Sequence, residues 1–350
     1  MPASKFFTID IGRAWTKAFL VSLDEKRNVE IQKSLKFPTP HTDISTTTKT
    51  MISGLINEKL PMVVVSRLKE AEQLAKEIEA VFVHEERASA SLVDYFKKIE
   101  KQVVILDAGA SHHETKIETK EIGKYLSFAI SEVALENFLG NKSFRPHTMP
   151  MNARDLEIEE AFYRNLFLGS MANTSPEEKL LLVATGGILS GTPNIYRLAI
   201  LLLDIMGNGQ VAQVYFDREF FLPSFGALLS EYKQLQLSEA GEWLDHLGAF
   251  VSLGSPLPVD LNWGYSLQQK IELTNEEIAL VPTSRDQKIK LEFTFENKKR
   301  DYNVTGGSLG LLFDAREKPL LLSFGQESSR SKVSSWLKQI EESRLAEEAF

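Results

Sequence analysis

The chain is organised around the stretch at residues 103–115, VVILDAGASHHET. Its apolar run ends at Asp107, Gly109 stands just beyond, and a polar turn leads directly into a second strand-like run, HHETKIE. An aspartate at the end of a buried strand can hold a metal ion, and a glycine in the turn lets backbone N–H groups approach phosphate oxygens. Asp-x-Gly hairpins are also common as simple chain reversals, so one copy says little about function.

The same layout occurs earlier in the chain. The run FFTIDIG carries Asp10 and Gly12 at the matching positions, and the strand-like run AFLVSL follows the turn RAWTK. A third stretch, LLLVATGGILSGTPN at 180–194, predicts a strand that ends at Gly186 and Gly187 and opens into a helix. The order of these three stretches is more specific than any one of them.

Two Asp-x-Gly hairpins followed by a strand, a Gly-Gly pair and a helix resemble the actin, Hsp70 and sugar-kinase ATPase superfamily. The resemblance covers roughly residues 5–230. It implies an α/β fold with two ribonuclease-H-like (actin-like) halves around a nucleotide cleft. The two hairpins would be the phosphate loops and the Gly-Gly turn the adenosine loop, with ATP and Mg²⁺ as cofactors.

A closer likeness rests on four motifs. They are Asp-x-Gly-x-x-x-Thr-Lys at 10–17, the Gly-Gly loop, YFDREFFLPSFGALL at 215–229 and GGSLGLLFDAREKPL at 306–320. Together they look like the glutamate-mutase accessory proteins labelled MutL, which are unrelated to the mismatch-repair proteins of similar name. This likeness implies an actin-like ATPase, and for some relatives a link to the reactivation of cobalamin-dependent mutases.

Composition excludes several other classes of function. The chain has 350 residues, 43% of them hydrophobic and 25% charged, as expected of a globular protein with a large core. A net charge of −8 argues against nucleic acid as the main partner, and the lack of cysteine excludes disulfides and thiolate chemistry. The amino terminus lacks the apolar core of a signal peptide, and Asp204 interrupts the longest apolar run, LAILLLDIM. We expect a cytoplasmic protein with no membrane insertion.

Hydrophobic periodicity divides the chain into three parts. In the first half, 1–101, we expect strands at 5–10, 16–23, 29–36, 62–66 and 80–84, and helices ending near 58 and at 67–79 and 91–99. In the second half, 102–238, we expect strands at 103–108, 113–119, 125–130, 180–185 and 211–217, and helices at 131–139, 194–206 and 223–235. A segment at about 140–178, with a helix at 153–168, breaks this order as an insertion. Residues 239–350 alternate apolar and polar, which predicts a separate β-rich carboxy-terminal module closed by a helix at 331–347.

Candidate site residues follow from the paired hairpins. If the hairpin tips face each other, as the resemblance implies, Asp10 and Asp107 can organise Mg²⁺ through its water ligands. Asp107 could also orient an attacking water, and His112 or His113 could act as a base or contact phosphate. The resemblance assigns nucleotide binding to Asp10, Gly12, Arg13, Thr16, Lys17, Gly109, Gly186 and Gly187.

Both phosphate loops depart from the superfamily pattern. Arg13 and Ala14 stand where small hydroxyl residues usually wrap the phosphates, and His112 and His113 stand where threonines are usual. An added positive charge binds a polyphosphate in the ground state as well as in the transition state, and such uniform binding does not raise turnover. We therefore expect an ATPase that is slow or inactive.

Other charged residues have structural interpretations. Asp217, at the end of an expected strand, can cap the helix that follows. Asp314 and Arg316 can form a local ion pair that fixes a turn.

The resemblance implies a nucleotide-dependent switch, such as a reactivase or chaperone-like accessory protein acting on a partner protein. That partner could be a mutase or an assembly complex, and self-association is also possible. A non-hydrolysing actin-like scaffold with degenerate phosphate loops is the alternative. A small-molecule kinase is a third hypothesis, for which only the segment 140–178 offers room for a substrate site.

Overall fold

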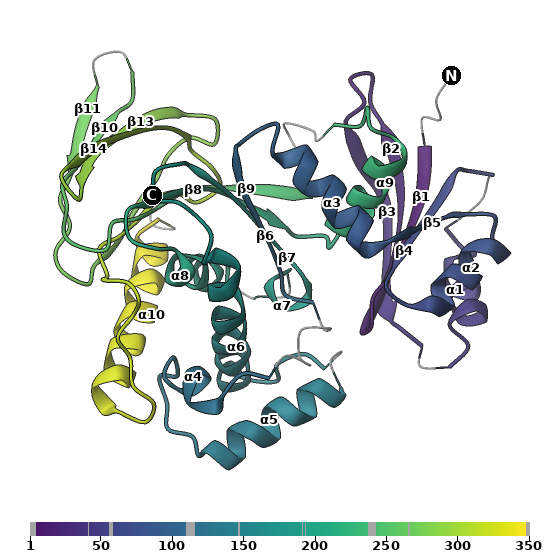
Figure 1. The fold of residues 1–350 in the computed structure, drawn as a ribbon, viewed down its shortest axis with the longest axis horizontal. Coiled ribbons are helices and arrows are strands. Elements are labelled where there is room, and N and C mark those ends of the chain that lie inside the picture. The colour runs from purple at the N-terminus through teal and green to yellow at the C-terminus, as the bar shows by residue number, and fades with distance from the viewer. Residues whose placement is uncertain are drawn as a thin grey trace.

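The computed structural model describes residues 5–40, 42–55, 59–109, 116–145, 148–190, 192, 194–236, 243–264 and 267–347. The strands in these ranges form three sheets, of five, four and six strands. Figure 1 shows the five-stranded sheet with its helices on the right and the other two sheets with the remaining helices on the left. The expected α/β fold of two halves is confirmed.

The first half has the strand order β3-β2-β1-β4-β5. Its strands are β1 (Lys5–Ile11), β2 (Trp15–Leu23), β3 (Val29–Pro38), β4 (Met62–Ser66) and β5 (Val81–His84). β1 runs antiparallel to β2 and parallel to β4, which is the order that a ribonuclease-H-like half requires. Because side chains alternate along a strand, Phe7 and Ile9 form one core with α1 (Ile44–Ile52) and α2 (Lys69–Glu77), while Phe6 joins another on the opposite face.

Two helices connect the halves. α3 (Glu85–Phe96) leads from β5 into the second half, and α9 (Leu222–Glu231) returns from the second half to pack on the first sheet. They cross closely at Gly226, where a Cβ atom would lie 2.6 Å from the carbonyl oxygen of Ala88. Leu92 and Phe225 belong to the core that both helices share with β1 and β4. The pair therefore forms the joint between the halves.

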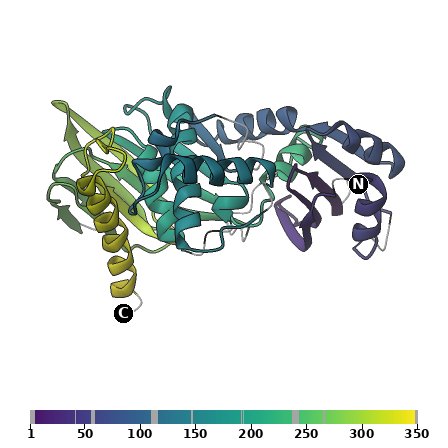
Figure 2. The same cartoon turned by 90° about the horizontal axis from the view of Figure 1, so that it is seen from below.

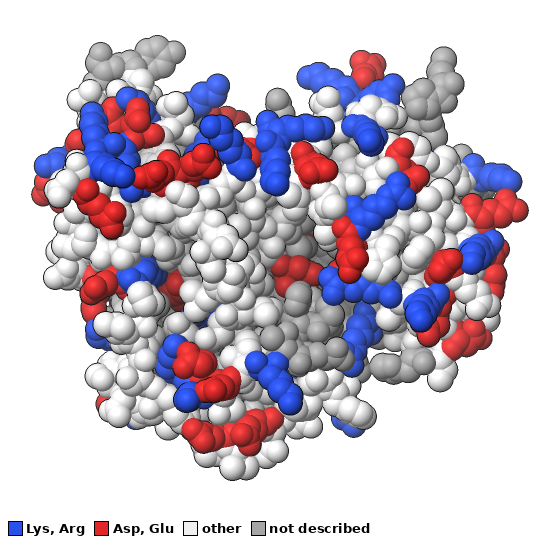
Figure 3. All heavy atoms as spheres, in the orientation of Figure 1, with Lys and Arg blue, Asp and Glu red and all other residues white. Residues whose placement is uncertain are grey.

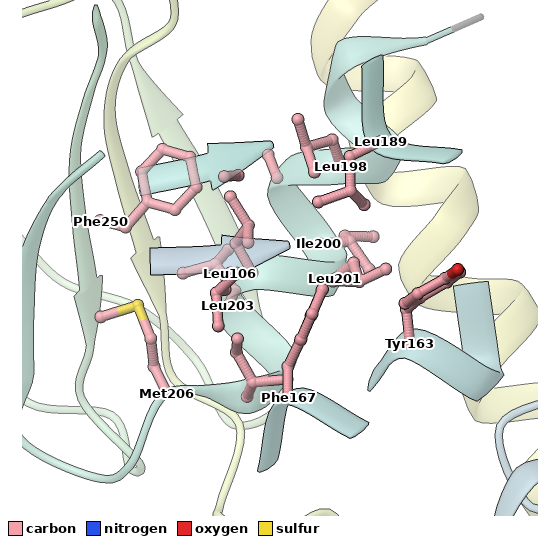
Figure 4. Close-up of a cluster of buried hydrophobic side chains, with 14 of the residues drawn as sticks. Leu106, Tyr163, Phe167, Leu189, Leu198, Ile200, Leu201, Leu203, Met206 and Phe250 are labelled. Carbon is pink, nitrogen blue, oxygen red and sulfur yellow. The ribbon is translucent and has the colours of Figure 1, made fainter. Parts of the chain in front are cut away.

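The second half is built on a six-stranded sheet in the order β12-β15-β9-β8-β7-β6. Its strands are β6 (Gln102–Asp107), β7 (Leu180–Thr185), β8 (Gln210–Asp217), β9 (Leu244–Ser252), β12 (Ile278–Val281) and β15 (Gly310–Asp314). The helices α6 (Ala153–Met171), α8 (Ile195–Ile205) and α10 (Glu327–Glu347) share one core with one face of this sheet. Figure 4 shows Leu106 of β6, Phe167 of α6, Leu201 of α8 and Phe250 of β9 in that core.

The strand expected at 125–130 is wrong, and so is the described part of the strand expected at 113–119, of which residues 113–115 lie outside the described residues. Residues 116–118 and 125–130 form no strand, and the short helix α4 (Thr119–Gly123) lies between them. Tyr125 and Leu126 are both buried although they are adjacent, which breaks the alternation that a strand requires. With Ile122 they join the core beneath α6. The helix α5 (Glu132–Phe144) follows, close to its expected place.

The prediction that residues 239–350 form a separate module is also wrong. β9, β12 and β15 complete the second half's sheet, with β9 antiparallel to β8 and parallel to β15. β9 is buried along almost its whole length, as befits a central strand rather than an alternating edge. Only β10 (Val259–Asn262), β11 (Gln268–Ile271), β13 (Lys288–Phe295) and β14 (Lys298–Thr305) form a sheet of their own, and it packs on the six-stranded sheet.

The outer surface carries mixed charge. Acidic and basic side chains are interspersed over the face shown in Figure 3, and pairs such as Lys49–Glu77 (2.6 Å) and Arg87–Glu231 (2.8 Å) link them. Figure 2 places the first-half sheet at one end of the molecule and α10 near the other. Within the described ranges, no helix is both long and apolar enough to cross a membrane.

Candidate functional site

A cavity of about 200 Å³ lies where the two halves meet. The first half lines it with the β1–β2 turn and the start of α3, and the second with the end of β6 and the Gly186 turn. The parallel strands β1, β4 and β5 end at one edge of their sheet, and β6, β7 and β8 end at one edge of theirs. The cavity therefore collects residues from strand ends, which is where α/β proteins usually bind ligands.

Asp10 and Lys17 form the charged centre of the first loop. They are directly opposite each other in the β1–β2 pairing, and Lys17 Nζ donates to Asp10 Oδ2 at 2.5 Å. Burial lowers the pKa of Lys17, but Asp10, Asp107 and Asp217 together outweigh this effect and raise it above its usual value. Lys17 is therefore a charged ammonium that contacts Asp10 and is also attracted by Asp107 and Asp217 of the second half.

Thr16 points to the other side of β2 and does not line the cavity. It is fully buried, and its hydroxyl lies 3.0 Å from that of Thr39. Thr39 Oγ1 donates to the carbonyl oxygen of Gly12 at 2.6 Å, and Thr39 N donates to that of Ala14 at 2.9 Å. Gly12 N in turn donates to Trp15 O at 3.0 Å. Thr16 thus helps to brace the first loop, and the structure does not place it where a cofactor ligand would be.

Asp107 and the Gly-Gly turn are in direct contact. Ala108 N donates to Thr185 O at 2.9 Å, which ties the ends of β6 and β7 together. Gly186 has a φ of 103°, and a Cβ there would lie 2.4 Å from Ala108 N. Only glycine fits this position without strain. Gly187 then begins the short helix α7 (Gly187–Ser190), and Asn194 caps α8 behind it through a 2.9 Å bond from Tyr196 N.

Tyr163 connects α6 to the second loop. Its hydroxyl donates to the carbonyl oxygen of Gly109 at 3.2 Å, and its side chain lines the cavity. Burial and the neighbouring Asp107 raise the pKa of Tyr163, so it remains neutral. The inserted helix therefore supports one wall of the site.

Glu85 and Arg67 line the cavity and were not expected from the sequence. They form an ion pair at 2.9 Å. Burial is the main cause of the raised pKa of Glu85, Arg67 opposes it, and Asp107 and Asp10 add to it. A signal did exist: Glu85 follows β5, which is parallel to β4 and hence to β1, so its strand ends at the same sheet edge as Asp10.

Asp217 has the structural role expected of it. Its carboxylate accepts from Phe221 N (3.1 Å), Leu222 N (2.8 Å) and Thr185 Oγ1 (2.8 Å), which caps α9. Burial raises the pKa of Asp217 to about 6, although these donors oppose the shift. The neighbouring Phe220 has a φ of 60° and also lines the cavity.

Most of the expected site residues that the structure describes meet in this one cavity. They are Asp10, Gly12, Arg13, Lys17, Asp107, Gly109, Gly186 and Gly187. His112 and His113 lie outside the described residues. In the described part of the chain, no group of three or more His, Asp or Glu side chains is arranged to hold a metal ion, so Asp10 and Asp107 remain as the predicted pair.

Comparisons with known proteins find only distant similarity. No protein-family model and no curated protein matches the chain. Component A of (R)-2-hydroxyglutaryl-CoA dehydratase from Acidaminococcus fermentans is 11% identical over 66% of this chain and 99% of its own, with a TM-score of 0.40. The ethanolamine utilization protein EutJ from Carboxydothermus hydrogenoformans is 12% identical over 65% of this chain and 90% of its own, with a TM-score of 0.37. A Ppx/GppA family protein from Aquifex aeolicus is 13% identical over 67% of this chain and 91% of its own, with a TM-score of 0.29. Such scores carry no functional argument, so the fold assignment rests on the strand order.

Proposed function

We propose that this chain is an actin-like nucleotide-binding protein that holds ATP–Mg²⁺ between its halves. One observation carries the proposal. Asp10 and Asp107, at corresponding strand ends of the two sheets, line a single cavity together with Lys17 and Gly186. The repeated Asp-x-Gly hairpin predicts this convergence, and a simple chain reversal does not require it.

The residues present fit such a ligand. Among the described residues, three carboxylates (Asp10, Glu85, Asp107) and three cations (Arg13, Lys17, Arg67) line the cavity, so these side chains leave the charge of a triphosphate unbalanced. Mg²⁺ would supply the missing charge, since it keeps several waters and needs only one or two carboxylates. Gly186 lines the cavity beside Asp107, and its missing side chain makes room for the Asp107–Ala108 segment.

The size of the cavity favours a switch. Its volume of about 200 Å³ is smaller than the roughly 300–1,000 Å³ of typical ligand sites. A nucleotide would therefore need the halves to move about the α3–α9 joint, as hinged domains do. When bound, ATP–Mg²⁺ would supply the γ-phosphoryl group whose loss distinguishes two states. We propose that a partner protein, such as a mutase or an assembly complex, reads these states.

A non-hydrolysing scaffold remains the second candidate. Ala14 is buried in the first loop and offers no hydroxyl, while Arg13 adds positive charge to the cavity wall. These are the changes that would weaken catalysis while preserving binding. Phosphate release faster than about one per second would contradict both the scaffold and the slow switch.

Calorimetric titration with ATP in the presence and absence of Mg²⁺ tests the proposal. Wild-type protein should bind ATP more tightly with Mg²⁺, and Asp107→Asn should lose that metal dependence while keeping its fold. Asp260→Asn is the matched control, since Asp260 is exposed on β10, outside the cavity lining. Failure of the wild type to bind ATP–Mg²⁺ at millimolar concentration would refute nucleotide binding.

A further inference from the structure

We infer that Lys17 is an internal cation that occupies Asp10, so that the cavity takes up a divalent cation only together with a polyphosphate. The inference rests on the proposed function and goes beyond it, because it concerns which ligands must arrive together. Its basis is the 2.5 Å contact between Lys17 Nζ and Asp10 Oδ2. The side chains are only 12% and 9% exposed, so bulk water does little to screen the pair.

The backbone holds the two residues in place. They are opposite each other in the antiparallel pairing of β1 with β2. Ser66 Oγ donates to the carbonyl oxygen of Ile11 at 2.6 Å, and Thr39 Oγ1 donates to the carbonyl oxygen of Gly12 at the same distance. Because the hairpin is braced just beyond Asp10, the ammonium stays on Asp10 Oδ2, and a metal ion can bind that oxygen only if the lysine side chain moves. The flexible four-carbon stem of lysine permits such a movement.

The charges around Lys17 set the cost of that movement. Its ammonium is attracted by Asp10, Asp107 and Asp217, and it lies 5.5 Å from the centre of the Phe220 ring. A divalent cation arriving alone would repel the ammonium and leave it buried with fewer partners, which is strongly unfavourable. A polyphosphate changes this balance, because its oxygens offer the ammonium a new anionic partner. Release of Asp10 is thereby coupled to the binding of the polyphosphate.

Mn²⁺ retained after ultrafiltration, measured by electron paramagnetic resonance of the acid-released ion, provides a readout independent of catalysis. Wild-type protein is incubated with Mn²⁺ alone, with Mn²⁺ and AMP, or with Mn²⁺ and ATP. AMP carries the nucleoside without a polyphosphate. We expect the protein to bind Mn²⁺ at least about tenfold more tightly with ATP than in the other two mixtures, because one strong charged contact has about this effect.

Variants then isolate the lysine. Lys17→Met should retain Mn²⁺ without any nucleotide, about tenfold more tightly than wild type. Lys36→Met is the matched control, since Lys36 Nζ lies over the same Phe220 ring at 4.9 Å but pairs with Glu219 rather than Asp10. It should behave as wild type. Lys17→Gln, which keeps a donor for Asp10 but no charge, serves if the methionine variant does not fold.

The outcomes separate this inference from the proposed function. If the folded Lys17 variants gain nothing, the inference is wrong and nucleotide binding stands. If wild type holds Mn²⁺ alone as tightly as with ATP, metal and ATP binding are uncoupled, and both the inference and the proposed ATP–Mg²⁺ binding are wrong. If wild type retains no Mn²⁺ even with ATP, both are wrong.

Discussion

Gly186 and Asp107 are so close that a Cβ atom on residue 186 would lie 2.6 Å from Asp107 Oδ1. The contact joins the turn after β7 to the carboxylate at the end of β6, and both line the cavity. Asp107 therefore has its position partly because residue 186 has no side chain. The glycine of one loop determines the geometry of the other.

Gly186→Ala should displace Asp107 and weaken ATP–Mg²⁺ binding by about tenfold or more, since one strong charged contact has that value. Gly264→Ala is the matched control, because Gly264 also has a positive φ (82°) but a Cβ there would meet nothing within 4 Å. Both variants carry backbone strain of about 1–3 kcal/mol, and only the first adds crowding. Equal ATP affinities of the two variants by calorimetry would contradict this account.

His246 is held neutral by its neighbours. The amide of Gln213 is oriented by the backbone of Thr305, because Nε2 donates to Thr305 O at 2.7 Å and Oε1 accepts from Thr305 N at 3.1 Å. Nε2 also faces His246 Nε2 at 2.5 Å, so that ring nitrogen must be the acceptor. Burial lowers the pKa of His246 to about 4.

Stability should therefore fall in acid. Between pH 6.5 and about 4, an unfolded histidine binds a proton that the folded His246 does not. The stability that depends on neutral His246 is therefore fully present above pH 6.5 and is lost as the pH falls toward 4. The loss is at most about 3 kcal/mol. His246→Asn keeps an acceptor for Gln213 but cannot titrate, and its free energy of unfolding should depend less on pH over this range. Urea titrations at several pH values measure it, with the exposed His84→Asn as control. Parallel pH profiles for wild type and His246→Asn would show that the histidine is not responsible.

Residues 1–238 alone should not fold. Without β9, β12 and β15, β8, which is buried along almost its whole length, would become an exposed edge strand, and part of the second half's core would be lost. The shortened chain should lack a cooperative thermal transition by circular dichroism and should aggregate on gel filtration. A sharp transition and a monomeric peak would restore the interpretation of 239–350 as a separable module.

The elements that the sequence predicts correctly are those that depend on local signals. The β1–β2 hairpin, with Asp10 and Lys17 at opposite positions, depends on alternation and a short turn, both visible in the printed residues. The pairing of β15 with β9 joins segments far apart in the chain, and nothing in either segment indicates its partner. Glu85 directly follows an expected strand, which is a signal, but its place in the cavity depends on the alignment of three parallel strands.

Arg316 is the centre of a buried charge network between α8, β15 and α10. Its guanidinium donates twice to Asp314, at 2.8 Å each, which confirms the expected pair, and its Nη1 lies 2.7 Å from Asp204 Oδ1. The ring of Trp336 on α10 lies 4.7 Å from the guanidinium carbon. Arg316 is itself fully buried, so its charge is balanced only by these two carboxylates and this ring among the described contacts.

Arg316→Met should lower the free energy of unfolding by about 3 kcal/mol or more, because breaking a buried pair leaves an uncompensated charge. Asp204 would keep Arg164 (2.6 Å) and Asp314 would keep Lys318 (2.8 Å), which places the expected loss at the lower end of the range for buried pairs. Arg330→Met is the control: Arg330 pairs with Glu327 at the exposed start of α10, where such a pair contributes less than about 1 kcal/mol. Denaturant titration of both variants measures the difference. If the two losses were equal, the network would contribute no more than a surface pair, and the attachment of α10 would come from its other contacts, such as those of the buried Val333, Trp336 and Ile340.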